Sequence, residues 1–231
     1  MNAPIDLGAA YDRWYSRIGA DRGDEGVLHA SDVGGCFYAT YTRLAGMPQI
    51  PKDEDSRAAF LMGFAVEDYV GGALAAFTAQ GYVVTKGREI AHRGLVGHLD
   101  YDLEKDGKCV AVIDVRTTKS KFLEVKHDHA LKSAFYADHL GAEWFCEWVF
   151  SLGFGKIVAQ KAFWLRTADY QAEIDANVMK LHGLTSEHSD APPIEPPRGE
   201  TWRCDKGYCD APCIRNARYT APITEETVVV I

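Results

Sequence analysis

Four cysteines, three near the C-terminal end and one far upstream, place the strongest constraint on how this chain folds. Cys204, Cys209 and Cys213 lie close together near the C-terminal end, in a C-x4-C-x3-C pattern, and Cys36 lies near the N-terminal end. Four thiolates are enough to hold one [4Fe–4S] cluster or one zinc ion. If they bind a single centre, the two ends of the chain must meet around everything between them.

The spacing of the three C-terminal cysteines bears on which metal they hold. It differs from the tight C-x2-C pairs of a zinc ribbon, so we favour an iron–sulfur cluster and keep zinc as the alternative. Gly207 and Pro212 are typical of a turn-rich ligand loop, which argues against a third interpretation, that of free thiols. Cys109 and Cys146 fall in strand patterns, so we expect them to pack in the core.

The composition excludes several classes of protein. The chain has 231 residues, of which 47% are hydrophobic and 25% charged, as is typical of one globular domain. We see no apolar run near the roughly 18 residues that a membrane span needs. Met1–Asp6 has no basic region before an apolar stretch, so we expect no signal peptide and a cytoplasmic protein. There, cysteines are more often thiols and metal ligands than disulfides.

The net charge of −8 argues against a nonspecific nucleic-acid binder. Charge acts locally, however. Between Arg116 and Lys132 the sequence has five basic and two acidic side chains. Acids at a metal site also lower the total without repelling DNA once Mg²⁺ is bound.

Apolar periodicity and turn residues predict a mixed α/β domain with a central sheet flanked by helices. Helices are predicted over 5–20, 31–46, 56–80, 128–140 and 168–184, and strands over 81–92, 95–104, 108–117, 143–151 and 156–166. A proline-rich stretch, 191–197, predicts an extended linker. We therefore divide the chain into an N-terminal helical segment (1–50), a core (51–190) and a linker with a cysteine-rich tail (191–231).

Two acids on neighbouring predicted strands form a candidate site for a hard metal ion. Asp114 and Arg116 lie two residues apart on one strand and share a face. A three-residue loop at 105–107 would pair Asp100 with Val112. Asp100 would then lie diagonal to Asp114, roughly 7–8 Å away on the same face, where the two acids can hold one or two cations.

Such a carboxylate pair can hold Mg²⁺, which lowers the pKa of a bound water, while a cation beside it stabilises charge on a phosphate. The alternative is an exposed hairpin whose charges face solvent. The apolar stretch Val110–Val115 favours a covered strand, in which charged side chains require partners. The same register would put His98 opposite Asp114.

Two predicted helices supply further candidates. Glu67 lies on an apolar stripe of the long helix, where a carboxylate is usually paired or metal-bound. Alternatively, this helix has a solvent edge at Glu67 and Asp68. Lys132 and Tyr136 share one face of the next helix, where they either contact a phosphate and a base or form an ordinary solvated edge.

These motifs resemble the RecB-type branch of the PD-(D/E)XK nucleases, in particular its iron–sulfur members such as the CRISPR-adaptation exonucleases and their phage relatives. The resemblance covers most of the chain. The matching segments are Ser31–Cys36 (first cluster ligand), Met62–Glu67 (helix with the first acid), Gly97–Asp100 (metal-binding Asp), Ile113–Lys119 ((D/E)-x-K strand), Lys132 with Tyr136 (Gln-x3-Tyr motif) and the three C-terminal cysteines (remaining cluster ligands).

The resemblance implies a restriction-endonuclease-like core with a central mixed sheet, plus a small iron–sulfur subdomain formed by the N-terminal helix and the C-terminal tail. It implies a Mg²⁺- or Mn²⁺-dependent DNA exonuclease of a prokaryote or phage, acting on single-stranded or end-containing DNA. Besides DNA, the partners that it implies are a second copy of the chain or an accessory recombination- or CRISPR-type protein.

The resemblance also assigns the site residues. Catalytic roles fall to Glu67, Asp100, Asp114, Arg116, Lys132 and Tyr136; metal binding to Glu67, Asp100, Asp114 and Val115; cluster binding to Cys36, Cys204, Cys209 and Cys213; and DNA contacts to Lys119, Lys121 and Lys132.

Two departures from the family pattern bear on activity. Arg116 stands where the family has Lys, and Lys132 stands where it often has Gln. Arg keeps the positive charge but cannot donate a proton at ordinary pH. Either Arg116 is an electrostatic clamp, or Lys119 or Lys132 reaches the site instead, or the enzyme is weakened or inactive. The alternative functions are thus a DNA-end-binding or assembly subunit of the same fold, and a zinc-stabilised interaction domain.

Overall fold

The computed structural model describes residues 26–50, 54–153, 156–185, 192, 204, 209 and 211–213. Its helices are α2 (Phe37–Leu44), α3 (Glu54–Leu74), α4 (His127–Leu140) and α5 (Gln171–Leu184), with 3-10 turns η1 (Ala30–Asp32), η2 (Ala75–Gln80) and η3 (Thr167–Asp169). Its strands are β1 (Leu28–His29), β2 (Val83–Lys86), β3 (Glu89–His92), β4 (Leu95–His98), β5 (Tyr101–Lys105), β6 (Lys108–Thr118), β7 (Trp144–Gly153) and β8 (Lys156–Arg166).

The predicted α/β architecture with a central mixed sheet is confirmed. Five strands form this sheet in the order β2-β5-β6-β7-β8, with β6 and β7 parallel and the other neighbours antiparallel. A small sheet has the order β1-β4-β3. The helix predicted over 5–20 lies outside the described residues, as does most of the stretch 191–231, so the division of the chain into three parts stays a prediction.

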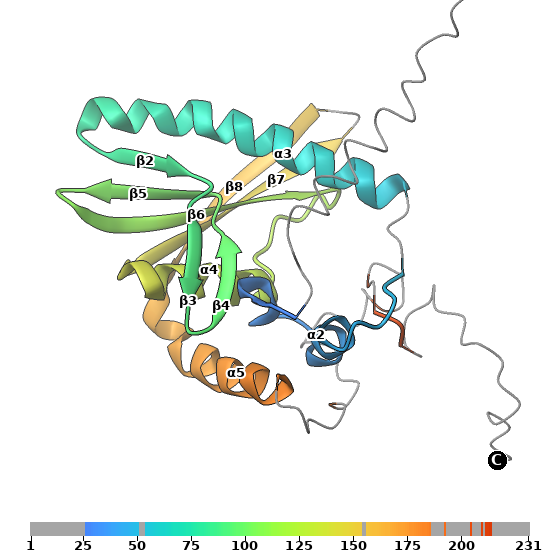
Figure 1. Cartoon of the computed structure of the whole chain (residues 1–231). Helices are drawn as coiled ribbons and strands as arrows, with labels where there is room; N and C mark the ends of the chain where they lie inside the picture. Colours follow the sequence, from blue (N-terminus) through green and yellow to red (C-terminus); the bar gives the residue numbers. More distant parts are fainter. Residues whose placement is uncertain are drawn as a thin grey trace, which may run out of the picture.

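The meander before β6 bends where the sequence suggested two straight strands. The predicted strand 81–92 is divided into β2 and β3 at Gly87, whose φ of 65° suits glycine. Across from it, the predicted strand 95–104 is divided into β4 and β5. The Gly87 amide donates to the Asp100 carbonyl at 3.0 Å, and the Leu99 amide to the Arg88 carbonyl at 3.1 Å. Strands β3 and β4 of the small sheet are therefore the far half of one bent hairpin (Figure 1), and β1 pairs with β4 beside them.

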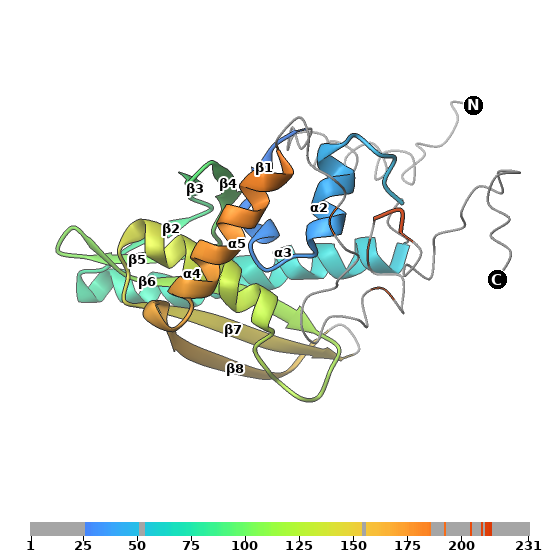
Figure 2. The ribbon, with the colours of Figure 1, turned by 90° about the horizontal axis from the view of Figure 1, so that it is seen from below.

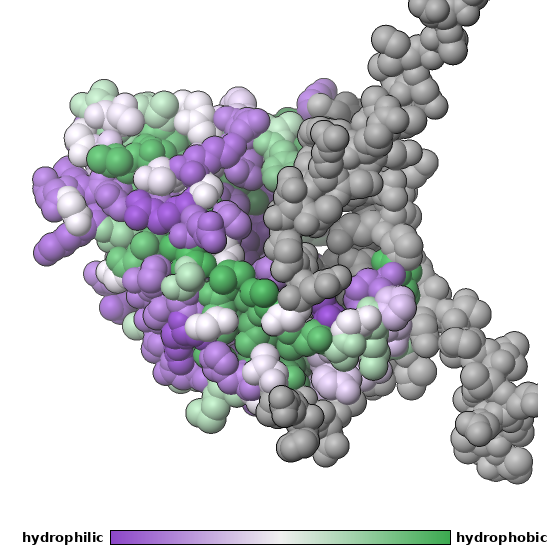
Figure 3. All heavy atoms as spheres, viewed as in Figure 1, coloured by the Kyte–Doolittle hydropathy of each residue, from purple (hydrophilic) through white to green (hydrophobic). Residues whose placement is uncertain are grey.

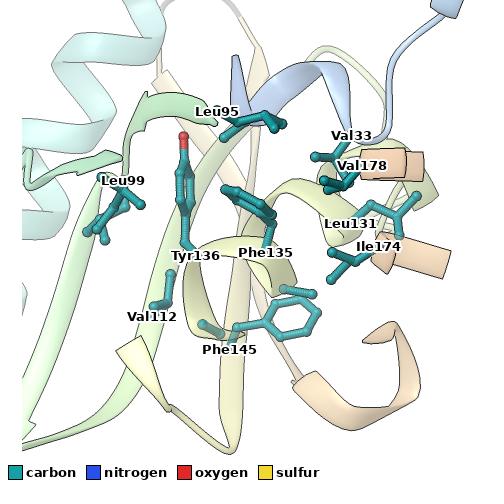
Figure 4. Packing of buried hydrophobic residues seen from close by; sticks show 14 of the residues in the cluster. Val33, Leu95, Leu99, Val112, Leu131, Phe135, Tyr136, Phe145, Ile174 and Val178 are labelled. Atoms are coloured by element: carbon teal, nitrogen blue, oxygen red, sulfur yellow. The ribbon is translucent and has the colours of Figure 1, made fainter. Parts of the chain in front are cut away.

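Helices cover both faces of the central sheet: α3 lies on one face, and α4 and α5 lie on the other (Figures 1 and 2). Under α3, buried Val66, Val70 and Leu74 pack with Ile113 of β6. The opposite core holds side chains from the sheet, α4 and α5, including Val112, Leu131, Phe135, Phe145 and Ile174 (Figure 4). Neighbouring β6 residues thus enter different cores, which explains why this strand is apolar on both faces.

One helical stretch of the described chain, Ala58–Gln80, is long and apolar enough to cross a membrane when judged by length and composition alone. We expected no such stretch from the sequence. Phe60 and Tyr69 of this stretch are exposed. Figure 3 shows hydrophobic residues along α3 above a hydrophilic band over β5. The inner side packs on the central sheet, as a helix of a globular α/β domain does.

The loop between η1 and α2 is held against the start of α4. Gly34 is buried, and a Cβ built on it would lie 2.6 Å from the Asp128 Cα atom. Real Cβ atoms do not approach a backbone so closely. Gly34→Ala should therefore force these segments apart and destabilise the protein by about 1–3 kcal/mol. This corresponds to a melting temperature lower by about 2–12 °C.

Thermal melts of Gly34→Ala and Gly72→Ala check this packing. Gly72 lies on α3 with nothing within 4 Å of its built Cβ, so Gly72→Ala should stabilise the helix slightly. A Gly34→Ala protein that melts with the wild type would show that this approach does not constrain the fold.

Candidate active site

The parallel pair β6 and β7 brings three charged side chains to the face that α4 covers. Asp114 pairs with Glu147 in register, and Arg116 follows two residues after Asp114. The side chains of Asp114 and Glu147 are each 1% exposed. On α4, the Ser133 hydroxyl donates to Glu147 Oε1 at 2.6 Å, and Lys132 Nζ lies 2.9 Å from Asp114 Oδ1. The prediction of a covered strand with partnered charges is thus confirmed.

Asp100 reaches the same group by a route that differs from the predicted one. The turn has two residues, Asp106 and Gly107, both with positive φ, so the expected three-residue loop is wrong. A register irregularity between Leu103 and Glu104 then shifts the pairing by one residue. As a result, Val112 pairs with Asp102 rather than with Asp100.

The shifted register continues towards Asp114. The last pair of the ladder joins Tyr101 to Ile113, so Asp100 and Asp114 are the next residues on each strand. Asp100 Oδ2 accepts a hydrogen bond from the Val115 amide at 2.7 Å. The expectation for His98 is wrong, since it lies in β4 of the small sheet with its side chain 65% exposed and 3.9 Å from Glu89.

Ion pairs hold the centre of this group. Arg116 Nε contacts Asp114 Oδ2 and lies 3.7 Å from Glu147 Oε2, while Lys132 approaches the other Asp114 oxygen. Both Asp114 oxygens and the Arg116 Nε and Nη2 atoms are buried, and none of them forms a hydrogen bond of good geometry. The contacts are therefore electrostatic attractions rather than a closed hydrogen-bond network.

The buried acids cannot all ionise easily. Burial, and then the Asp114 charge, raises the pKa of Asp100 to about 7, against the opposing effects of Lys132 and Arg116. Burial and Asp114 likewise raise the pKa of Glu147 to about 8. For Arg116, burial alone would lower the pKa, but Asp114 and Glu147 raise it above its usual range, so the guanidinium stays charged. Further positive charge here would favour ionisation of the acids.

The structure places Glu67 apart from this group. Glu67 lies on α3, which covers the opposite face, and its carboxylate is 3.5 Å from Lys86 Nζ. Its backbone carbonyl accepts a hydrogen bond from the Tyr101 hydroxyl at 2.8 Å. The side chain is 18% exposed, so it is a half-buried, paired carboxylate, whereas Asp68 is 74% exposed. A catalytic or metal-binding role for Glu67 stays a prediction.

Lys132 and Tyr136 face the sheet, so the alternative of a solvated edge is wrong. The Lys132 side chain is 15% exposed and Tyr136 is 2% exposed, with Lys132 Nζ 5.6 Å from the centre of the Tyr136 ring. Tyr136 packs in the core beside Phe135 (Figure 4). Lys119 and Lys121 are exposed in the segment after β6. Only Lys132 of these lysines is seen in contact with the acids.

Sequence reasoning missed Glu147. It is the one charged residue between Trp144 and Phe150 in an otherwise apolar strand. A charge in a buried strand requires a partner, and this rule, which drew attention to Asp114, would also have found Glu147.

The cysteines of the predicted cluster occupy two places in the described structure. Cys36 directly precedes α2 and is half-buried, while Cys204 and Cys213 are buried and Cys209 is half-buried. The Ala211 amide donates to Cys209 Sγ at 3.4 Å. Residues 211–213 lie beside α2 and the segment that follows it (Figures 1 and 2). Cys146 is buried and Cys109 packs against the core, as expected.

None of the six cysteines, all of which lie in the described ranges, forms a disulfide. Within the described ranges, no three His, Cys, Asp or Glu side chains are grouped closely enough to hold a metal ion by themselves. The donor chemistry suits a soft metal at the cysteines and a hard one at Asp100 and Asp114. The metal identities therefore stay proposals.

Comparison with solved structures concerns the fold. The protein SSO0001 matches with a TM-score of 0.52 and 14% identity, over 89% of this chain and 93% of its own. An alkaline exonuclease from Laribacter hongkongensis matches with a TM-score of 0.47 and 15% identity, over 75% of this chain and 94% of its own. Its complex with dAMP gives 0.46 and 16%, over 69% and 90%. The likeness to SSO0001 supports the central-sheet architecture.

Neither a family model nor a curated protein matches the sequence.

The raised pKa of Glu147 gives stability a specific pH dependence. The folded value of about 8 exceeds the ordinary 4.5, so between these values the folded protein binds more protons than the unfolded chain. The free energy of unfolding should therefore fall as pH rises through this range, by up to about 1.4 kcal/mol per pH unit and proton. In Glu147→Gln the part of this slope that Glu147 contributes should be lost, most clearly near pH 8, where Asp100, with a pKa of about 7, has released most of its proton.

Urea unfolding in the presence of a chelator measures this slope, because a bound cation would ionise the acids. Glu143→Gln is the matched control, since the Glu143 side chain is 66% exposed and should leave the slope unchanged. An unaltered slope in Glu147→Gln would contradict the assignment of a buried, protonated carboxyl.

Proposed function

We propose that this protein is a Mg²⁺- or Mn²⁺-dependent deoxyribonuclease, an exonuclease that hydrolyses phosphodiester bonds in single-stranded or end-containing DNA. The observation that carries the proposal is the convergence of Asp100 and Asp114 on one face, beside Arg116 and Lys132. The two carboxylates can bind a divalent metal ion, and the two positively charged side chains can stabilise a phosphate beside it.

The donor set fits a hard divalent cation. Both Asp114 oxygens lack a hydrogen bond of good geometry, and Asp100 gives only Oδ2 to the Val115 amide. Mg²⁺ is usually held by one or two carboxylates, with water and substrate phosphate completing its shell, so two acids are enough. The Val115 carbonyl is a further candidate ligand. A metal bound here would lower the pKa of a water and polarise the phosphoryl oxygen.

The two cations have separable tasks. Arg116 can give two charge-assisted hydrogen bonds to the scissile phosphate and stabilise the charge that develops on it. Lys132 Nζ lies 2.9 Å from Asp114 Oδ1, so its charge can hold this carboxylate in place and attract the phosphate to it. Of the three alternatives for the working cation, the geometry favours Arg116 and Lys132 over Lys119, which is exposed beyond the end of β6.

Incubation with 5′- and 3′-labelled single- and double-stranded DNA, with and without Mn²⁺, tests the function directly. Wild-type protein should degrade one labelled end only when metal is present. Asp114→Asn should lose both cleavage and Mn²⁺ binding with an unchanged circular dichroism spectrum. Asp175→Asn, which alters an exposed acid on α5, serves as the control.

Substitutions at the two cations should separate their tasks. We expect Arg116→Ala to lower the cleavage rate at least about 10²-fold, as removal of one charge-stabilising group does. Arg116→Lys should retain or raise the rate, since the resembling family has Lys here. Lys132→Ala should also slow cleavage, because it removes the second positive charge beside Asp114. Rates that survive both Arg116→Ala and Lys132→Ala would move the active site elsewhere.

A second candidate function is a DNA-end-binding or assembly subunit with weakened catalysis. The observation that favours it is that Asp114 is already paired with both Arg116 and Lys132. If this is the function, the wild-type protein binds DNA ends without cleaving them, and only the Arg116→Lys variant cleaves them. The rates of that variant decide between the two functions.

We also propose that Cys36, Cys204, Cys209 and Cys213 bind one structural [4Fe–4S] cluster, with zinc as the alternative metal. The supporting observations are that none of the four cysteines is in a disulfide, that Cys204 and Cys213 are buried, and that residues 211–213 lie beside α2. Such a cluster would tie the tail to the start of α2.

Anaerobically purified protein should contain iron and a broad visible absorbance band. Replacement of any one of the four cysteines by Ala should bleach that band and lower the melting temperature, because a ligand that ties distant segments stabilises the fold. Cys109→Ala, which alters a core thiol, should leave the band intact. A quadruple variant that keeps its iron would overturn the cluster, and stoichiometric zinc without a band would favour the alternative metal.

A further inference from the structure

The segment that joins β6 to α4 carries the most exposed large hydrophobic side chain of the described chain. Phe122 is 83% exposed. Lys119, Ser120 and Lys121, which precede it, are exposed as well. Single exposed hydrophobic residues are common, so exposure alone indicates nothing. Two further observations distinguish Phe122. Hydrogen bonds hold its segment to the central sheet, and the segment follows the strand that carries Asp114.

The backbone beneath Phe122 is tied to the central sheet. The Ser120 amide donates to Thr118 Oγ1 at 3.0 Å, and the Phe122 amide donates to Ser120 Oγ at 3.0 Å. Ser151 of β7, which is 1% exposed, donates its hydroxyl hydrogen to the Ser120 carbonyl at 2.8 Å. The segment is thus anchored, and the aromatic ring still points away from both cores.

This anchored segment continues the strand that bears the candidate active site. Asp114 and Arg116 lie on β6, which ends at Thr118, and the segment leads on to α4 with Lys132. The four residues from Asp114 to Thr118 span about 13 Å of strand. The Ser120 carbonyl is held by Ser151, which pairs with Thr118, so the anchored segment begins about that far from Asp114. A DNA strand rises about 3.4 Å per nucleotide even when it is stacked in a duplex, so a few nucleotides from a phosphate at Asp114 reach this segment.

We propose that Phe122 is a stacking platform for an unpaired base of the DNA substrate, and that Lys119 and Lys121 neutralise the phosphates on either side of that base. The proposal rests on the proposed nuclease function and names how its site selects single-stranded DNA. An aromatic ring between lysines suits an unpaired strand, because stacking contributes about 1–3 kcal/mol per base for any base. In a duplex the base faces are already stacked on their neighbours.

The first test is the affinity for a fluorescent single-stranded oligonucleotide, measured by anisotropy in an Asp114→Asn background that prevents cleavage. Adding Phe122→Ala should weaken binding by about 5- to 160-fold and leave the affinity for blunt duplex unchanged. Tyr69→Ala is the matched control, because Tyr69 is an aromatic residue 61% exposed on α3, across the sheet. Equal affinities for single strands with and without Phe122→Ala overturn the proposal.

An abasic scan identifies the contact itself. In a set of oligonucleotides that each lack one base, the protein with Phe122 should lose affinity at one position, and the Phe122→Ala protein should not. A purely structural effect of Phe122→Ala would lower affinity for every oligonucleotide and leave the abasic profile unchanged, which would also overturn the proposal.

The lysines are tested by the salt dependence of binding. Removing Lys119 and Lys121 together should reduce the slope of log K against log salt by about 1.4, the value for two phosphate contacts on a single strand. Phe122→Ala should leave this slope unaltered, and an unaltered slope in the double lysine variant would contradict their role.

The binding and cleavage results together also distinguish failure of the stacking proposal from failure of the proposed nuclease function. Wild-type cleavage together with unaltered binding by Phe122→Ala would overturn the stacking platform alone. Absence of binding to every oligonucleotide would overturn both.

Discussion

The candidate site depends on the ion pairs that hold the buried carboxylate of Asp114. Its carboxylate lies 1% exposed on the longest described run of apolar sheet residues, where a lone charge would be prohibitively costly. Arg116 and Lys132 offset that cost. Burial, and then the Asp114 charge, raises the pKa of Asp100 to about 7 and that of Glu147 to about 8. A divalent cation entering this group would release the protons of these acids and take over part of the pairing, which links metal binding to local charge.

Successive side chains of β6 point to opposite faces of the sheet, so residues that pack in a core alternate with residues of the candidate site. Ile113 packs under α3, whereas Asp114 and Arg116 face α4, so one core stabilises the sheet while the opposite face presents charges. Parallel pairing with β7 adds Glu147 beside Asp114, and the bent hairpin delivers Asp100 from the other side. The candidate site is therefore built at the centre of the sheet, with side chains from β6, β7, α4 and the bend before β5.

The sequence allowed much of this to be predicted. Alternation and a covered apolar strand identified Asp114, Arg116 and the sheet, and helical spacing identified Lys132. The hairpin register was beyond reach, because the irregularity at Leu103 and Glu104 leaves no periodic signal and reverses the face of every residue before it. The apolar stripe predicted for α3 matches its inner side only in part, because Val66, Val70 and Leu74 are the residues that are buried there. The stripe also did not indicate which face of the sheet the helix would cover, so the place of Glu67 could not be foreseen.

A crystal structure with Mn²⁺, read by anomalous scattering, tests the central claim most directly. A metal peak contacting both Asp100 and Asp114 is predicted, with Lys132 Nζ displaced from its 2.9 Å contact with Asp114. Saturating Mn²⁺ that leaves no peak at these acids, and Lys132 still paired with Asp114, would contradict the account.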